Sequence, residues 1–543
     1  MHMPQLAPHL FHLLHQQGVH HAFGIPGDFA LTLYDALGAS QIAPIVMTHE
    51  PCAGFAADTY ARLRGLGLAV VTYSVGGLNM VNAVAGAYAE KSPLVVVSGA
   101  PGVQERHPRA LLHHKVKTFD TQRRMYEEVT LYATALTDPQ TADRKMHRAL
   151  DYALTFKRPV YLEIPRDMVY ADIDEVEHRP PPIKHTDPET LQEALAETIE
   201  LLTRAQSPVM LVCAEVHRFG LQEQVVALAE RLGVPVSATV LGKSVFPEGH
   251  AQYIGVYNGE VGDLQVRDIV EASDCLLMLG VCMTDLNLGM FTAHFDPRRT
   301  VYASSERIAI KHHEYPHVRF EDFLTALWSS PALPQRTPSG IVTMHPRVTP
   351  SPGRISMSGL LYELNHFIDR NTLLVTDVGD VLFAADDIQT QAGTSFVSSA
   401  FYSSMGFAVP GVIGAQLAEP SRRAIALVGD GAFQMTGMEL LTAKRLGLRP
   451  IVIVTHNDAF NTLRVMGHQQ AAFVSIPSLD YAKFAEVLGG RGFVIETGAA
   501  LHQALHSACD SRTFSVLDVH LSPDDLSPAL HRLRGLFAKK LQG

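Results

Sequence analysis

One stretch in the last quarter of the chain constrains the fold more than any other: Gly429-Asp430-Gly431, followed by Asn457 at a distance of 27 positions from Asp430. The apolar runs 424–428 and 451–454 each predict a buried strand. Met and Leu at helical spacing between them predict a helix, so the stretch forms a βαβ unit. Asp430 and Asn457 are therefore expected together at the carboxyl ends of two parallel strands, where open α/β sheets bind ligands.

The residue types at these strand ends suit a diphosphate held through a metal ion. One carboxylate (Asp430) and one amide oxygen (Asn457) suit Mg²⁺, which keeps its other positions for phosphate oxygens and water. The glycines beside Asp430 let backbone N–H groups approach a phosphate. An Asp-Gly pair alone most often marks a turn, but a turn explains neither the paired strand ends nor their spacing.

Composition describes a large globular enzyme. A chain of 543 residues should hold about three domains, and 47% apolar with 18% charged residues indicates well-buried cores. The net charge of −11 and the lack of a basic stripe argue against a nucleic-acid partner. No run of 18 apolar residues predicts a membrane span, and no early Lys or Arg marks a secretory signal, so a cytoplasmic location is expected. The five cysteines lack CxxC spacing and are expected to be small buried residues.

Two proline-rich stretches, 178–182 and 331–352, divide the sequence as linkers. Domains are therefore expected at 1–175, 188–330 and 354–543. Apolar strands alternate with helical patterns in all three, which predicts an α/β protein of three doubly wound parallel-sheet domains. The middle domain is expected to be a scaffold or regulatory unit, because no GxGxxG follows a strand there.

Three features of the first domain are candidates for the other half of the site. They are Gly24-Ile25-Pro26-Gly27-Asp28 after a short strand, Glu50-Pro51 at the start of a helix, and the pair His113-His114. Each has an ordinary explanation when taken alone. Asp28 could cap a helix, and Glu50 could be a helix-start acid before an N-terminal proline. Three adjacent histidine pairs occur in this sequence, so a pair alone indicates little.

Together with 429–437, these features resemble the thiamine-diphosphate-dependent 2-keto acid decarboxylases. Within that family the stretches GIPGDFAL (24–31), NAVAGAYAEKSP (82–93) and GDGAFQMTG (429–437) look closest to the phenylpyruvate or indolepyruvate decarboxylases. The match runs in collinear order through nearly the whole chain. It implies non-oxidative decarboxylation of an aromatic or bulky 2-keto acid to an aldehyde and CO₂, through the ylid of thiamine diphosphate with Mg²⁺.

The resemblance also implies roles for individual residues. Glu50 would bond the cofactor pyrimidine, and Asp28, His113 and His114 would move protons at the reacting carbon. The backbone carbonyl of Ser403 would accept from the cofactor's amino group, and Met405 would lie under the thiazolium. The implied cofactor contacts are Glu50, Thr72, Asp380, Ser403, Met405, Asp430, Gly431, Ala432 and Asn457. The implied magnesium ligands are Asp430, Asn457 and the carbonyl of Ala459.

Two positions depart from the family pattern. Pyruvate decarboxylases carry a glutamate six residues after the metal-binding Asn, where this chain has Leu463. An apolar Leu463, with Thr72, would line a substrate pocket suited to a larger side chain. The family's Asn-Asn is replaced by His456-Asn457, followed by Asp458. A register slip of one would make Asp458 the ligand, but Asn457 keeps the expected separation from Asp430.

The implied partners are a small 2-keto acid and further copies of this chain, with no nucleic acid and no membrane. Pyrimidine contacts fall in the first domain and diphosphate contacts in the last, and in this family the two come from different subunits. A homodimer or a dimer-of-dimers tetramer with interface sites is expected. A carboligase of the acetolactate synthase or benzaldehyde lyase type and a pyruvate decarboxylase are the alternatives. A nicotinamide-dependent oxidoreductase is disfavoured by the missing GxGxxG.

Overall fold

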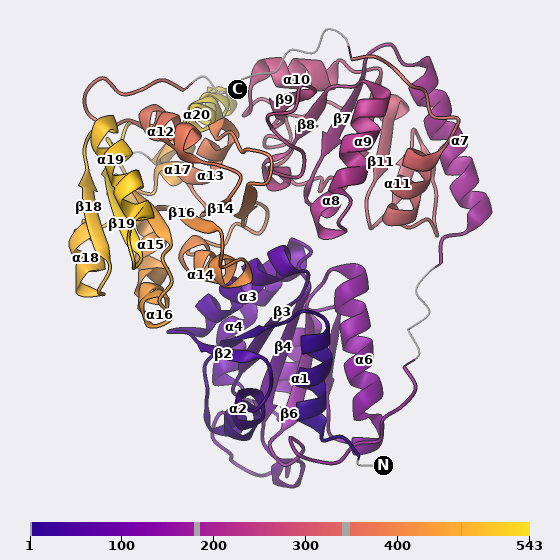
Figure 1. Cartoon of the computed structure of the whole chain (residues 1–543), viewed down its shortest axis with the longest axis vertical. Coiled ribbons are helices and arrows are strands. Elements are labelled where there is room, and N and C mark those ends of the chain that lie inside the picture. Colours follow the sequence, from indigo (N-terminus) through magenta and orange to yellow (C-terminus); the bar gives the residue numbers. More distant parts are fainter. Residues whose placement is uncertain (1–2, 179–184, 339–347, 469, 543) are drawn as a thin grey trace.

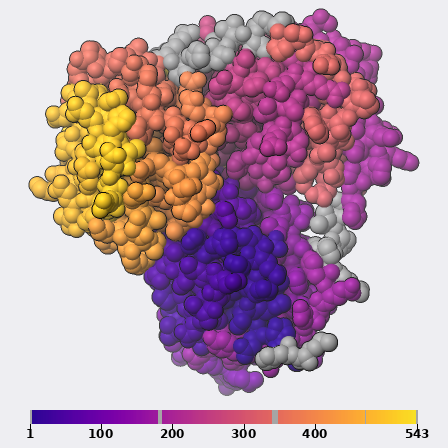
Figure 2. Space-filling view, in the orientation of Figure 1, coloured from indigo at the N-terminus to yellow at the C-terminus, as the bar shows by residue number. Residues whose placement is uncertain are grey.

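The computed structural model describes residues 3–178, 185–338, 348–468 and 470–542. It contains three sheets, each with helices on both faces (Figure 1). The first domain lies below the other two, which sit side by side above it, and all three pack directly on one another (Figure 2). This is the α/β architecture of three parallel-dominated sheets that the strand and helix patterns predict. The predicted domain boundaries stay a prediction, because 179–184 and 339–347 lie outside the described residues.

The first sheet is wholly parallel, with strand order β2-β1-β3-β4-β6-β5. One apolar core lies on each of its faces. The strands are β1 (His21–Gly24), β2 (Ala43–Val46), β3 (Gly67–Val71), β4 (Leu94–Ala100), β5 (Tyr132–Ala135) and β6 (Val160–Pro165). The helices are α1 (Leu6–Gln16), α2 (Leu31–Gly38), α3 (Glu50–Arg64), α4 (Val75–Ala89), α5 (Thr121–Glu127) and α6 (Pro139–Phe156).

The middle sheet is mixed, with order β13-β12-β11-β10-β7-β8-β9. Its edge strands β12 and β13 run antiparallel, so this sheet is predominantly, not wholly, parallel. Only Ser304–Arg307 separate β11 from β12, and a connection that short forms a hairpin, not a crossover. The strands are β7 (Pro208–Val212), β8 (Val236–Ala238), β9 (Tyr253–Val256), β10 (Cys275–Leu279), β11 (Thr300–Ala303), β12 (Ile308–Ile310) and β13 (His313–Glu314). The helices are α7 (Pro188–Arg204), α8 (Ala214–Arg218), α9 (Gln222–Leu232), α10 (Leu264–Glu271) and α11 (Phe320–Ser329).

The last sheet is again wholly parallel, in the order β15-β14-β16-β17-β19-β18, between two apolar cores. The strands are β14 (Thr372–Thr376), β15 (Ser395–Ser398), β16 (Arg423–Gly429), β17 (Ile451–His456), β18 (Arg491–Ile495) and β19 (Ser515–His520). The helices are α12 (Met357–Phe367), α13 (Asp380–Ala384), α14 (Ala408–Ala418), α15 (Asp430–Thr436), α16 (Leu440–Arg445), α17 (Asn461–Leu463), α18 (Tyr481–Val487), α19 (Gly498–Cys509) and α20 (Pro528–Gln542). The predicted βαβ unit is β16-α15/α16-β17, and its two strands pair directly.

The three domains meet through buried polar contacts and one close helix pair. Helix α14 lies so near α3 that a Cβ on Gly414 would come within 2.1 Å of the Ala56 carbonyl oxygen. Lys91 pairs with Glu215 between the first and middle domains, with both side chains buried. None of the described helices is both long enough and apolar enough to cross a membrane.

Candidate active site

The first group of predicted residues gathers where β1 and β3 end. A Cβ on Gly27 would lie 2.6 Å from Cβ of Thr72, and one on Gly76 would lie 3.5 Å from Oε1 of Glu50. Glu50 is half-buried in the first turn of α3, and its Oε2 accepts a hydrogen bond from Nδ2 of Asn79 at 2.7 Å. The Thr72 hydroxyl oxygen is buried and has no hydrogen-bond partner among the described residues. Gly27 therefore allows the backbone to pack closely against Thr72, and Gly76 lies beside both Thr72 and Glu50.

Asp28, His113 and His114 form a second cluster on the same domain. Nε2 of His113 bonds Oδ2 of Asp28, and Nδ1 of His114 lies 3.9 Å from the other carboxylate oxygen. Phe29 stacks on the His113 ring with centroids 4.7 Å apart. Burial opposes ionisation of Asp28, but the His113 hydrogen bond and the nearby imidazoles outweigh it and lower its pKa. The cluster therefore holds a carboxylate and two titratable rings that can exchange a proton.

Asp430 begins α15, directly after β16. Its Oδ2 accepts the backbone N–H groups of Asn457 at 3.0 Å and Asp458 at 2.7 Å, and its Oδ1 accepts that of Gly431 at 2.8 Å. Oδ1 of Asn457 accepts the Ala459 N–H at 3.1 Å. The carboxylate and the amide oxygen are thus brought together at the ends of β16 and β17, as the spacing predicts.

The donor set around Asp430 fits a divalent cation. Asp430 is 2% exposed, yet no side-chain cation of the described residues forms an ion pair with it. Burial raises the pKa of Asp430, and the three backbone N–H groups offset this only in part. A buried carboxylate with no ion-pair partner among the described residues, beside a residue that carries an amide oxygen, supplies the oxygen ligands that Mg²⁺ prefers.

Ser403 and Met405 lie on the loop before α14. Ser403 has φ of +58°, a left-handed conformation that non-glycine residues adopt mainly where the surroundings impose it. Asp377 fixes the loop, because its carboxylate accepts the N–H groups of Gly406 at 3.0 Å and Ala408 at 2.7 Å. Burial raises the pKa of Asp377 to about 6, although the backbone donors lower it. Met405 is half-buried and packs against the apolar core of the last domain.

Four further predicted residues, described next, also belong to the last domain. Asp380 is buried at the start of α13, and its carboxylate accepts the Ser527 N–H at 3.2 and 3.3 Å. A Cβ on Gly431 would lie 2.4 Å from the Phe460 ring, so only glycine fits there. Ala432 is buried in α15. Leu463 ends α17 with 41% of its surface exposed.

Comparison with known proteins agrees with this geometry. Three family models match: "Thiamine pyrophosphate enzyme, N-terminal TPP binding domain" over residues 4–124, the central domain over 195–323, and the C-terminal TPP binding domain over 377–519. An indole-3-pyruvate decarboxylase of Azospirillum brasilense is 38% identical over 97% of both chains. The chain belongs to the thiamine-diphosphate-dependent 2-keto acid decarboxylases. Its cofactors are thiamine diphosphate (thiamine pyrophosphate) and Mg²⁺.

More distant relatives of this decarboxylase also align along most of their length. A putative pyruvate decarboxylase of Schizosaccharomyces pombe is 31% identical, with 86% of this chain and 85% of the relative covered. Pyruvate decarboxylase isozyme 1 of Saccharomyces cerevisiae is 27% identical, with 90% and 89% covered. The family is therefore clear, but its members are named for different keto acids: indole-3-pyruvate in one case and pyruvate in the other two.

Sequence reasoning missed several polar residues that position the site of this decarboxylase. Asn79, which bonds Glu50, sits in a helix of small and apolar residues and carries no motif. Asp377 lies three residues before Asp380, an implied cofactor contact, so its place in the sequence was a signal that could have identified it. His456 joins Asp518 at 2.7 Å and Asp458 at 3.0 Å, which occupies the Asp458 carboxylate.

The predicted residues of the decarboxylase site lie on both the first and the last domain. Among the described residues, no hydrogen bond or ion pair connects Glu50, Asp28 or His113 with Asp430 or Asn457. The two domains touch close to these residues, since Thr48 donates to Glu439 at 2.6 Å and Asn82 donates to Ser404 at 2.8 Å. Large exposed apolar side chains flank both halves: Leu31, Val75 and Leu111 on the first domain, and Met435, Met438 and Phe473 on the last.

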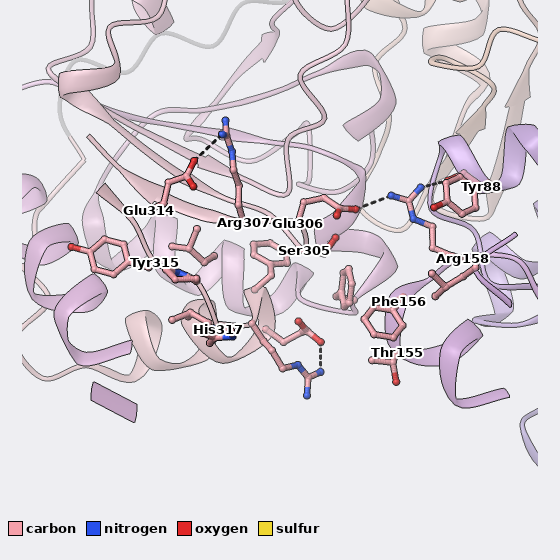
Figure 3. A pocket seen from close by; sticks show the side chains of 18 residues that line it. Tyr88, Thr155, Phe156, Arg158, Ser305, Glu306, Arg307, Glu314, Tyr315 and His317 are labelled. Atoms are coloured by element: carbon pink, nitrogen blue, oxygen red, sulfur yellow. Dashed lines mark hydrogen bonds and ion pairs between the residues drawn. The ribbon is translucent and has the colours of Figure 1, made fainter. Parts of the chain in front are cut away.

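A separate cleft of about 640 Å³ opens between the first and middle domains (Figure 3). Arg158 lies on its wall, where it bonds Glu306 at 2.8 Å. None of the predicted site residues lines this cleft. This cleft is therefore separate from the candidate active site.

Proposed function

We propose that this chain decarboxylates an aromatic 2-keto acid of the phenylpyruvate or indole-3-pyruvate class to the corresponding aldehyde and CO₂. The observation that carries the proposal is the 38% identity, over 97% of both chains, to a relative named for indole-3-pyruvate. The relatives named for pyruvate reach 27–31%. Leu463 adds to this, because an apolar, exposed side chain at the predicted pocket favours a bulky apolar substrate group.

In this proposal the last domain holds the diphosphate end of the cofactor. Asp430, Asn457 and the Ala459 carbonyl would bind Mg²⁺, since they supply hard oxygen ligands. Asn457 is preferred to Asp458, because the Asp458 carboxylate is bonded to His456. Gly431 and Ala432 offer backbone close to the phosphates, and Asp380 lies at the neighbouring strand end.

The first domain would hold the pyrimidine end and Glu50 would bond it. Asn79 orients the Glu50 carboxylate through the bond at 2.7 Å. Ser403 and Met405, on the loop that Asp377 fixes, would support the rings, and Thr72 offers its unpartnered hydroxyl to cofactor or substrate. When bound, thiamine diphosphate supplies the electron sink that lets CO₂ leave.

Asp28, His113 and His114 would deliver and remove protons at the reacting carbon. The hydrogen bond between His113 and Asp28, with Nδ1 of His114 3.9 Å from the same carboxylate, holds one carboxylate and two imidazoles close together. Both Asp28 and His113 are exposed to solvent in the single chain, so the cluster can exchange protons with water.

We also propose that the active unit is a dimer in which the first domain of one chain faces the last domain of its partner. The exposed apolar side chains beside the predicted residues of each domain support this arrangement. A dimer or a dimer of dimers would complete the site.

The substrate is tested by comparing kcat/KM for phenylpyruvate, indole-3-pyruvate and pyruvate with thiamine diphosphate and Mg²⁺ present. The aromatic acids should be preferred by roughly tenfold or more, because a pocket discriminates a buried apolar group on this scale. Leu463→Glu should reduce that preference, whereas Leu264→Glu, at an exposed position in the middle domain, should not. A preference for pyruvate would make the chain a pyruvate decarboxylase. Formation of 2-hydroxy ketones in place of aldehydes would favour the carboligase.

A further inference from the structure

A cluster of histidine and aspartate lies on the first domain, away from every residue assigned to the active site. His9 comes from α1, and Asp143 and His147 come from α6, which packs beside α1 (Figure 1). Nε2 of His9 is 2.9 Å from Oδ1 of Asp143, and Nε2 of His147 is 3.5 Å from the same oxygen. One ligand atom of each residue lies within 4.8 Å of the others.

The surrounding residues hold these three side chains in place. Asp143 and His147 are four residues apart and so share one face of α6. The second carboxylate oxygen of Asp143 accepts the Val176 N–H at 2.9 Å, which leaves Oδ1 directed at the two imidazoles. The His178 ring stacks on His147 with centroids 4.3 Å apart. Nε2 of His178 lies 3.3 Å from Oδ1 of Asp151. Asp151 is four residues after His147 and so lies on the same face of α6.

The charges of the cluster favour a cation. The Asp143 side chain is fully buried, and the second carboxylate oxygen of Asp151 is buried without a hydrogen-bond partner among the described residues. No Lys or Arg in the described part of the chain pairs with either carboxylate, and their charged partners are histidines alone.

We propose that His9, Asp143 and His147 bind one divalent transition-metal ion, with Zn²⁺ the best match. Two imidazoles and one carboxylate are typical zinc ligands, whereas Mg²⁺ prefers oxygen ligands only. Donors bound about 2.0–2.2 Å from one ion lie some 3–3.5 Å from each other; the 3.5 Å from His147 to Asp143 falls in this range, and the 2.9 Å hydrogen bond from His9 would lengthen slightly on binding. The fourth position is left to water.

The ion would link α1 and α6 close to the segment through which the chain leaves the first domain. The start of α1 already pairs with the exit segment, since Leu6 N–H donates to the Ala171 carbonyl at 3.0 Å and Ala7 N–H to that of Val169 at 3.0 Å. The site adds a link between α1, α6 and this segment, through Asp143 and Val176. Its expected effect is therefore on the stability of the first domain and not on turnover.

Two other clusters of the described residues could be compared with this one, and neither is a separate site. Asp28, His113 and His114 belong to the proposed catalytic cluster. His456, Asp518 and His520 lie beside the predicted magnesium ligand Asn457, and both ring nitrogens of His456 already have partners.

The test is calorimetric titration of the full-length protein with zinc chloride, with thiamine diphosphate and saturating Mg²⁺ present in a non-chelating buffer. Wild type and His12→Gln should bind one Zn²⁺ per chain, because His12 is an exposed residue of the same helix outside the cluster. His9→Gln and His147→Gln should each bind this ion at least roughly tenfold more weakly. Glutamine at position 9 can still donate to Asp143, which separates loss of the metal from loss of the fold.

Two further readouts are visible absorption, which needs wild type alone, and thermal stability, which compares wild type with the variants. Co²⁺ in place of Zn²⁺ should give visible absorption bands of a four-coordinate ion, and Zn²⁺ should raise the thermal midpoint of wild type and His12→Gln only. Equal zinc affinity in wild type and both cluster variants would overturn the proposal. Absence of saturable binding to wild type would do the same, and the histidines would then only hydrogen-bond Asp143.

Discussion

At the scale of single residues, the buried carboxyl of Asp380 determines part of the pH dependence of stability. Burial raises its pKa to about 7, although the Ser527 hydrogen bonds lower it. An unfolded Asp ionises near pH 4, as a rough guide, so between these values the folded chain keeps a proton that the unfolded chain loses. Stability therefore falls as pH rises through this window.

Asp380→Asn mimics the protonated carboxyl and should remove part of that fall. Its thermal midpoint, measured without cofactor from pH 5 to pH 8, should decline less than that of wild type. Asp510→Asn, at an exposed position, should keep the wild-type slope. Parallel slopes for Asp380→Asn and wild type would show that this carboxyl does not titrate in the window.

At the scale of elements, one buried ion network joins α3 to the end of α4 and to β15 of the last domain. The Arg62 guanidinium bonds both oxygens of Asp58, at 2.9 and 2.7 Å, and also Glu90 at 2.7 Å and the Ser398 carbonyl at 2.8 Å. Arg62→Met would leave two buried carboxylates without a cation, which costs about 3–5 kcal/mol.

The thermal midpoint of Arg62→Met should fall clearly below that of wild type. The matched control is Arg204→Met, which removes the exposed pair with Glu200. An exposed pair contributes about 0–1 kcal/mol, so this midpoint should barely move. Equal midpoints for the two variants would mean that the Arg62 network adds no net stability.

Strands and motifs could be predicted from the sequence, but the contacts that position the site could not. Apolar runs located β16 and β17, because buried parallel strands are uninterrupted in sequence. The hairpin β11-β12 was missed, since short mixed strands at a sheet edge lack that signal. Asn79 and the positive φ of Ser403 depend on tertiary packing, which no local pattern records. The site residues were predicted through the family resemblance, and their roles stay a proposal.

At the scale of the whole molecule, the proposed dimer predicts complementation between inactive subunits. Glu50→Gln disables the first-domain half and Asp430→Ala the last-domain half. When the two variants are mixed and allowed to exchange, half of the dimers should be mixed, and each mixed dimer should hold one intact site. Aldehyde release should recover to about a quarter of the wild-type value for a closed two-fold dimer. No recovery, despite demonstrated exchange, would place both halves in one chain.

The most direct measurement of the central claim is aldehyde release from phenylpyruvate by protein stripped of cofactors. Wild type should be inactive alone and active after addition of thiamine diphosphate and Mg²⁺ together. Glu50→Gln with both additions should be slower by roughly 10²–10⁴-fold, the range for loss of a proton-transfer group. Aldehyde release without thiamine diphosphate, or an unimpaired Glu50→Gln, would contradict the account.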